Sequence, residues 1–285
     1  MRPAKLLFLA LVLALLAGVP AAQAAAPKRI VALTPFSANT LAGLGVKPVG
    51  IGETPGDNER RASNLKGVKK LTLSHPNGPN MEELALLNPQ LAFSSPTWAK
   101  GAKTMRDLGI KVVNADPVDV AGTVTQTTMI GKVVERESSA QQLAQRLKDQ
   151  IAAARKSIRK HPRTLVVLGV GRTPFVLLPN SWGGDVVRKA GARLITAGVT
   201  SSSGFARISD ETILKANPDV IIAIPHANSD DIPEVTKYLR NNPAWEDSRA
   251  VRNDKLFVST DNSLLQANTN VADVIRKVRR VYLKN

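Results

Sequence analysis

Short apolar runs alternate with helical patterns along most of the chain. In the first half, runs rich in Val, Ile or Leu and bounded by Gly, Pro or Asn predict strands at residues 29–33, 47–52, 90–94 and 110–115. Helical patterns separate them at residues 80–88 and 101–109. Strands that alternate with helices favour parallel pairing, with helices on both faces of the sheet.

The second half repeats this plan. Strands are predicted at residues 164–170, 219–224 and 255–259, and helices near residues 183–190, 210–216 and 232–240. A last helix closes the chain at residues 268–284, with five apolar residues on one face.

One long helical pattern lies between the halves. Within residues 138–160, apolar residues recur at spacings of four, four, three and four, and the segment contains no Gly or Pro. We therefore predict two parallel-sheet α/β lobes joined by a single long α-helix, with a ligand cleft between them. The predicted domains are an N-terminal lobe (27–135), a connecting helix (136–160) and a C-terminal lobe (161–285).

Two stretches of the chain repeat one pattern. "NMEELALLNPQLAF" from Asn80 and "SDETILKANPDVII" from Ser209 align without a gap, so that Glu82 matches Glu211. In each, a capping residue begins a helix, an acidic residue lies in its first turn, and Asn-Pro ends it before a strand. Any capped helix before a strand has some of these features. A gapless match at corresponding places favours two equivalent lobes.

The first residues have the pattern of a secretory signal peptide (residues 1–24). Arg2 and Lys5 form a basic start, an apolar run follows at residues 6–17, and Ala22-Gln23-Ala24 offers a cleavage site. The apolar run is shorter than the roughly 20 residues of a membrane-spanning helix. We expect cleavage after Ala24 and a periplasmic product. The chain has no cysteine, so we expect no lipid-anchored cysteine at the cleavage site.

The charge of the chain favours anionic partners. Removal of residues 1–24 takes away Arg2 and Lys5 and leaves 37 basic and 23 acidic residues, a formal net charge of +14. This suits an acidic ligand or a membrane surface. The basic residues are scattered and aromatic residues make up only 4% of the chain, which argues against nucleic-acid binding.

Five segments in order resemble one family. They are "RIVALTP", "NMEELALLNPQLAFSS", the helix of residues 138–160, "ISDETILKANPDVIIAIP" and "PAWEDSRAVRNDKLFVS". The chain resembles the solute-binding proteins of ABC importers whose two lobes are joined by a long helix, a group that carries cobalamin, ferric siderophores and heme. The resemblance implies a monomeric carrier with no permanently bound cofactor, which meets the membrane only through a permease and its ATPase. It also implies that Glu82 and Glu211 dock to the permease. The alternative is that both acids only favour helix starts.

Ligands of open parallel sheets bind beyond the carboxyl ends of the strands. Two of the three histidines, His75 and His226, lie on such loops, one in each lobe, whereas His161 ends the connecting helix. Residues 217–251 resemble the heme-binding branch, in which a histidine at the position of His226 is an axial ligand of the iron. Asn77 stands where that branch has a methionine, so His75 is the candidate second ligand. The alternative is that both are ordinary surface residues.

Other residues suit the remainder of such a ligand. Phe36, Trp98, Trp182 and Phe205 are candidate walls for the apolar macrocycle, and Arg207 is a candidate partner for its propionates. Cobalamin also accepts an axial histidine and stacks on tryptophan. Anionic ferric siderophores favour arginine and tryptophan, for which Arg172 is a further candidate. Heme, cobalamin and ferric siderophores therefore all remain as transported ligands.

Motifs of the rival classes are missing from the sequence. The chain has no Gly-x-Ser-x-Gly elbow, no His-Glu-x-x-His zinc motif and no Gly-rich phosphate loop that opens a helix. We therefore expect no enzymatic activity, with an exported hydrolase as the alternative. An exported structural or adhesive module has no need of two duplicated α/β lobes.

Overall fold

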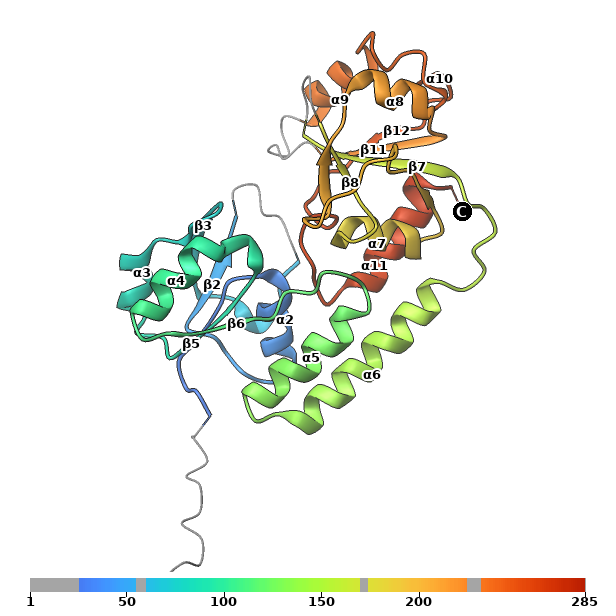
Figure 1. Ribbon diagram of the computed structural model, residues 1–285. Helices are drawn as coiled ribbons and strands as arrows, with labels where there is room; N and C mark the ends of the chain where they lie inside the picture. Colours follow the sequence, from blue (N-terminus) through green and yellow to red (C-terminus); the bar gives the residue numbers. More distant parts are fainter. Residues whose placement is uncertain (1–25, 55–59, 170–173, 225–231, 285) are drawn as a thin grey trace, which may run out of the picture.

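The computed structural model describes residues 26–54, 60–169, 174–224 and 232–284, and Figure 1 shows two α/β lobes. The first lobe is built on one sheet with the strand order β4-β3-β2-β1-β5-β6. Its strands are β1 (Ile30–Ala32), β2 (Gly50–Glu53), β3 (Lys69–Ser74), β4 (Gly78–Pro79), β5 (Leu91–Ser94) and β6 (Lys111–Asn114). The predicted strands at 29–33, 47–52, 90–94 and 110–115 are thus confirmed.

The second lobe is built on a sheet with the strand order β10-β8-β7-β11-β12, and β9 pairs with β7. Its strands are β7 (Arg163–Leu168), β8 (Phe175–Leu177), β9 (Arg193–Leu194), β10 (Phe205–Arg207), β11 (Val220–Ile224) and β12 (Leu256–Val258). All five residues of β11 are buried, as expected for a central strand covered on both faces.

The expectation of parallel pairing holds for the inner strands and is wrong at one side of each sheet. β4 runs antiparallel to β3, and β8 runs antiparallel to both β7 and β10. The reason is the length of the connections. Residues 75–77 join β3 to β4, and residues 169–174 join β7 to β8, whereas a parallel crossover needs a dozen or more residues.

Helices cover the sheets. Those of the first lobe are α2 (Pro35–Gly43), α3 (Met81–Leu86) and α4 (Ala99–Asp107), with short 3₁₀ turns η2 (Ser63–Leu65) and η3 (Pro96–Trp98). Those of the second lobe are α7 (Trp182–Lys189), α8 (Asp210–Ala216), α9 (Ile232–Arg240), α10 (Arg249–Arg252) and α11 (Val271–Lys277), which continues as the π-helical turn η5 (Val278–Tyr282).

Two antiparallel helices, α5 (Gly122–Val133) and α6 (Glu137–Ala154), lie between the lobes in the sequence and pack against each other (Figure 1). The predicted connecting helix (136–160) is too long, because α6 ends at Ala154. The guanidinium of Arg279 donates to the carbonyl oxygens of Ala154 (2.5 Å) and Ser157 (3.4 Å), and Ser157 has a positive φ of 60°. A contact from a residue 125 positions away thus accompanies the end of the helix, and a local pattern does not reveal it.

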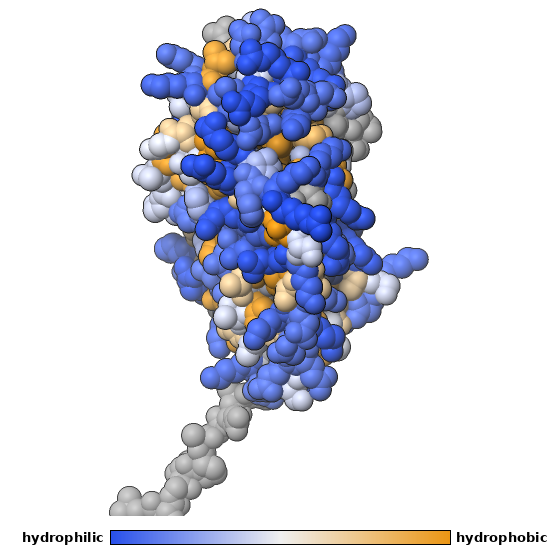
Figure 2. Space-filling model, turned by 90° about the vertical axis from the view of Figure 1, so that its right-hand side faces the viewer, coloured by the Kyte–Doolittle hydropathy of each residue, from blue (hydrophilic) through white to orange (hydrophobic). Residues whose placement is uncertain are grey.

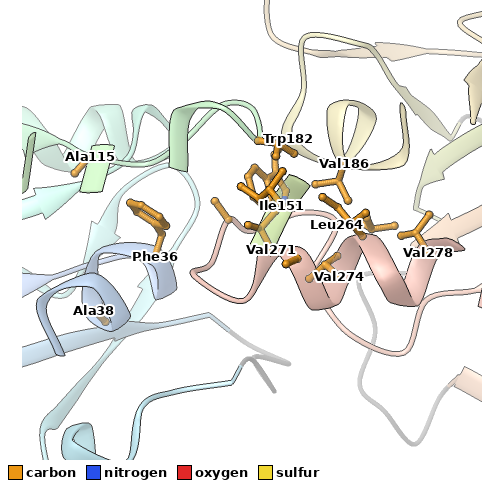
Figure 3. Packing of buried hydrophobic residues seen from close by; sticks show 14 of the residues in the cluster. Phe36, Ala38, Ala115, Ile151, Trp182, Val186, Leu264, Val271, Val274 and Val278 are labelled. Atoms are coloured by element: carbon orange, nitrogen blue, oxygen red, sulfur yellow. The ribbon is translucent and has the colours of Figure 1, made fainter. Parts of the chain in front are cut away.

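One apolar cluster extends through both lobes (Figure 3). Phe36 on α2 of the first lobe and Ile151 on α6 belong to the same cluster as Trp182, Val186 and Val271 of the second lobe. Burial of continuous apolar surface stabilises the lobes in one arrangement, at roughly 25 cal/mol for each Å² removed from water. The two lobes therefore share an apolar core beside α6, in addition to their connection through the chain.

The outer surface is largely polar. The side of the molecule that carries the link from α6 to β7 is mostly hydrophilic, with small scattered apolar groups (Figure 2). In the part of the chain that the structure describes, no helix has both the length and the apolar character to cross a membrane.

Candidate ligand-binding cleft

The parallel strands of the first sheet end at one common edge. Thr34 lies just beyond β1, His75 follows β3 directly, Ser95 follows β5, and Asp116 lies two residues after β6. β1 is parallel to β2 and β5, β2 is parallel to β3, and β5 is parallel to β6, so all these ends lie on the same side. This is the edge at which ligands of such sheets bind.

His75 is exposed at this edge and lies against Trp98. The two rings meet edge to face, with their centroids 6.3 Å apart and their planes at 63°. Trp98 is only 7% exposed, and its Nε1 is buried without a hydrogen-bond partner among the described residues. Trp98 therefore supports the imidazole from behind, while His75 remains accessible to a ligand.

The corresponding edge of the second sheet carries an arginine over an aromatic ring. Arg207 pairs in register with Phe175, which pairs with Leu168 at the end of β7. The guanidinium lies 5.5 Å from the centroid of the Phe175 ring, and Phe175 is 37% exposed. Cation–π contact holds the guanidinium over an apolar surface. Sequence reasoning missed Phe175, whose one signal is its place in a short apolar run after the sequence "GVGRTP".

The second predicted histidine is not placed. His226 and Arg172 lie outside the described residues. Ile224, the last residue described before His226, is the register partner of Leu168. β11 thus ends at the edge that carries Arg207, so the chain towards His226 begins there.

Two predicted wall residues prove to be core residues. Phe36 has no exposed surface, and Trp182 is 7% exposed with its Nε1 donating to the carbonyl oxygen of Ser263 (2.9 Å). Both belong to the shared apolar cluster, because α2 and α7 turn their first residues towards the other lobe (Figure 3). Neither lines a cleft in this conformation. Phe205 is half-buried and packs against the same cluster, so only part of its ring is accessible.

Polar contacts join the lobes beside this cluster. Asn39 Nδ2 donates to Asn268 Oδ1 (2.7 Å), and Gln266 Nε2 donates to Thr54 Oγ1 (2.8 Å). The Val120 N–H donates to Asp185 Oδ2 (3.0 Å). These contacts join residues of the two lobes beside the shared apolar cluster. Sequence reasoning missed them, because isolated Asn, Gln and Thr residues give no signal of a long-range partner.

Three aspartates have perturbed pKa values. Burial raises the pKa of Asp116 to about 7, although the hydroxyls of Ser95 and Thr34 act in the opposite direction. Burial also acts to raise the pKa of Asp219, but hydrogen bonds from the Arg163 N–H and from Arg249 outweigh it and lower the pKa. Asp261 follows the same rule, since hydrogen bonds from Lys277 and Ser263 lower its pKa against the effect of burial.

Glu82 and Glu211 are both exposed in the first turns of α3 and α8. No ion pair to another described residue is recorded for either carboxylate. The acids next to them in the sequence, Asp210 and Glu83, do have partners. Asp210 accepts a hydrogen bond from Trp245 Nε1 (2.6 Å), and Glu83 lies 3.9 Å from Lys69 Nζ. The two matched acids are therefore free to meet a partner.

Among the described residues, no three His, Asp or Glu side chains are grouped so as to hold a bare metal ion.

The model of the periplasmic binding protein family matches residues 30–262. The chain belongs to that family. Its members are substrate-binding proteins, not a class of enzymes.

Among curated relatives, the high-affinity heme uptake system protein IsdE of Staphylococcus aureus (strain MRSA252) is 26% identical over 190 residues. The match spans 65% of this chain and 64% of the relative's length, just under two thirds.

Solved structures share the fold. An ABC transporter substrate-binding protein from Listeria monocytogenes EGD-e has a TM-score of 0.79 at 21% identity, over 90% of this chain and 99% of that one. S. aureus IsdE complexed with heme has a TM-score of 0.74 at 23% identity, over 89% and 98%. At these identities the likeness shows the two-lobed fold alone.

Proposed function

We propose that the protein is the periplasmic substrate-binding component of an ABC importer, and that it captures heme between its lobes for delivery to a permease powered by an ATPase. The observation that carries the proposal is the pair of carboxyl edges. One presents the exposed imidazole of His75 against Trp98, and the other presents Arg207 over Phe175. In this proposal the mature chain begins after Ala24 and works as a soluble monomer without a lipid anchor.

Each side chain has a role in the proposed complex. His75 and His226 bind the ferric iron from opposite faces through neutral imidazole nitrogens. Phe175 and Phe205 contact the apolar macrocycle, and Arg207 pairs with a propionate. The name of the curated relative, a heme uptake protein, supports this choice of ligand.

A ferric siderophore or cobalamin is the second candidate. Arg207 suits the anionic oxygens of a siderophore, and an exposed histidine also suits the cobalt of cobalamin. An exported hydrolase is the alternative of a different class, and the sequence motifs that would favour it are missing.

We also propose that Glu82 and Glu211 dock the protein onto the permease. They lie at equivalent places in the two lobes, and charges at the rim of an interface mainly steer and orient association. A permease with two-fold symmetry would meet one acid from each lobe.

Equilibrium binding separates these ligands. The mature protein is mixed in turn with hemin, cyanocobalamin and a ferric hydroxamate, and the complexes are weighed by native mass spectrometry. The proposal predicts one hemin per chain, released unchanged, and no stable complex with the other two. A stable complex with a different chelate would transfer the proposal to that ligand. A chemically altered product would contradict the carrier function.

A further inference from the structure

An uncompensated carboxyl lies where three strands of the first sheet end. Asp116 follows β6 and lies beside the hydroxyls of Thr34, beyond β1, and Ser95, beyond β5, which act to lower its pKa. Its Oδ1 has almost no accessible surface and no hydrogen-bond partner among the described residues, although the residue as a whole is partly exposed. This is the edge that also carries His75.

No charged group contributes to the pKa shift of Asp116, and the guanidinium of Arg61 donates to the carbonyl oxygen of Gly52 (3.0 Å), near the end of β2 on the same edge. β1, β5, η3 and α2 contain no ionisable residue. Lys111 begins β6 at the opposite end of the strand, and Lys132 lies in the last turn of α5. The nearby acids are engaged elsewhere, since Asp119 Oδ1 accepts from the Gly122 N–H (2.6 Å) and Asp185 Oδ2 accepts from the Val120 N–H.

Burial therefore acts on Asp116 without any opposing charge, and its pKa rises to about 7, with only the two hydroxyls lowering it. Asp219 and Asp261 differ in this respect. Each has an arginine or lysine at 2.6–2.7 Å, and the pKa of each is lowered. Asp116 has no such cation beside it, and this is the difference between it and the other two aspartates.

The same segment joins the edge of the cleft to the other lobe. Ala115 is fully buried in the shared apolar cluster, and four residues after Asp116 the Val120 N–H donates to Asp185 on α7. The charge on Asp116 thus acts on a stretch of chain fixed at both ends, beside the loops that would meet a ligand.

We propose that Asp116 is a positioning residue whose protonation controls ligand capture, and that the protein takes up its ligand in the form in which this carboxyl carries a proton. The inference rests on the proposed function. A bound ligand excludes water from the edge, and a carboxylate without a cation is then disfavoured, whereas a carboxylic acid still exchanges hydrogen bonds with Thr34 and Ser95. An anionic ligand adds repulsion of like charges.

Unfolding of the ligand-free protein tests the protonation alone. A folded-state pKa above the unfolded value means that the folded state holds the extra proton between about pH 4 and pH 7, so this group destabilises the fold as the pH rises through that range. In urea, Asp116→Asn should lose this component and be more stable than the wild type at pH 8. Asp119→Asn, which keeps the acceptor for Gly122, should follow the wild type. Superimposable profiles for Asp116→Asn and the wild type would overturn the inference.

Hemin titrations from pH 6 to pH 8.5 test the capture. With a pKa of about 7, the fraction of the protein in which Asp116 is protonated falls from about nine tenths at pH 6 to about 3% at pH 8.5. The affinity of the wild type for hemin should therefore weaken about 30-fold, whereas Asp116→Asn should keep its affinity. Calorimetry of the wild type in two buffers of different ionisation enthalpy gives a reading that needs no variant, with close to one proton taken up at pH 8 and almost none at pH 6.

The possible failures are distinct. Saturable hemin binding with no loss of affinity above pH 7, or with the same loss in Asp116→Asn, would overturn this inference and leave the proposed function standing. Absence of saturable hemin binding by the wild type at every pH would overturn both.

Discussion

In both lobes an arginine at the start of the first strand hydrogen-bonds to the end of the repeated helix; Arg29 directly precedes β1, and Arg163 is the first residue of β7. Arg29 donates to the carbonyl oxygens of Leu87 and Asn88, and Arg163 donates to those of Ala216 and Asn217. Asn88 and Asn217 both have a φ of 42°. Leu87 matches Ala216, and Asn88 matches Asn217, in the alignment of the two stretches.

The contacts of the two arginines differ at one matched position, Gln90 in the first lobe and Asp219 in the second. In the first lobe, Gln90 Oε1 accepts from the N–H of Arg29, and in the second lobe Asp219 Oδ2 accepts from the N–H of Arg163. Asp219 also binds Arg249 of α10 (2.7 Å). The arginine therefore has a neutral neighbour, Gln90, in the first lobe and an ionised neighbour, Asp219, in the second, so the lobes should differ in their response to pH.

Truncating a matched core residue should have the largest effect on stability, and the effect should be equal in the two lobes. Leu84 and Ile213 are matched residues with no exposed surface. Leu84→Ala and Ile213→Ala should each lower the free energy of unfolding by about 2–5 kcal/mol, because each leaves a cavity in a packed core. Urea denaturation of the mature protein measures this. Leu86→Ala on the same helix, at a position 86% exposed, should change the stability by less than about 0.5 kcal/mol. A large loss in only one lobe would contradict the equivalence.

Replacing the two arginines should lower the free energy of unfolding by unequal amounts. Arg163→Ala should cost about 2–3 kcal/mol, because it removes bonds to two carbonyl oxygens and a charge beside Asp219. Arg29→Ala should cost about 1–2 kcal/mol, because its neighbour Gln90 is neutral. Arg→Lys at each site is the matched control, since it keeps the charge and loses the planar fork. Equal losses for both alanine variants would remove the proposed difference.

Exchanging the charge at the matched positions Gln90 and Asp219 tests the predicted difference in pH response. The lowered pKa of Asp219 means that its stabilisation is present above the unfolded pKa of about 4 and is lost as the pH falls towards the folded pKa. Asp219→Asn should therefore lose less stability between about pH 5 and pH 3 than the wild type does, and Gln90→Glu should lose more. The variants are compared by urea midpoints across this range. Parallel profiles for all three proteins would contradict the account.

The smallest effects on stability belong to the matched acids. Glu82→Gln and Glu211→Gln should change the free energy of unfolding by less than about 0.5 kcal/mol, because both carboxylates are exposed. They should leave hemin affinity unchanged but slow uptake through the reconstituted importer, most strongly in the double variant. Glu83→Gln is the neighbouring control. Normal uptake by the double variant would show that these acids only favour helix starts.

The repeat and most elements could be predicted from the sequence, because they depend on local chemistry. The predicted helices at 210–216 and 232–240 coincide with α8 and α9, whose apolar spacing and flanking residues are informative. β3 was missed because only Leu71 and Leu73 of its six residues are buried, which leaves a short and weak alternation.

The rest depends on partners that are distant in the sequence. A pattern predicts that Phe36 and Trp182 are apolar and near the strand ends, but not that α2 and α7 bury them against the other lobe. Likewise, nothing local marks Arg279 as a partner of Ala154 and Ser157, or Asp116 as a carboxyl without a cation.

The central claim is that one ligand spans both lobes and is held by a histidine from each. Its most direct test is a visible-absorption titration of the mature protein with hemin, repeated for His75→Ala, His226→Ala and, as a control, His161→Ala. The account predicts a saturable one-to-one Soret shift in the wild type and the control, with an altered band and weaker binding in both cleft variants. Unchanged spectra and affinities in both cleft variants, or no saturation in the wild type, would contradict it.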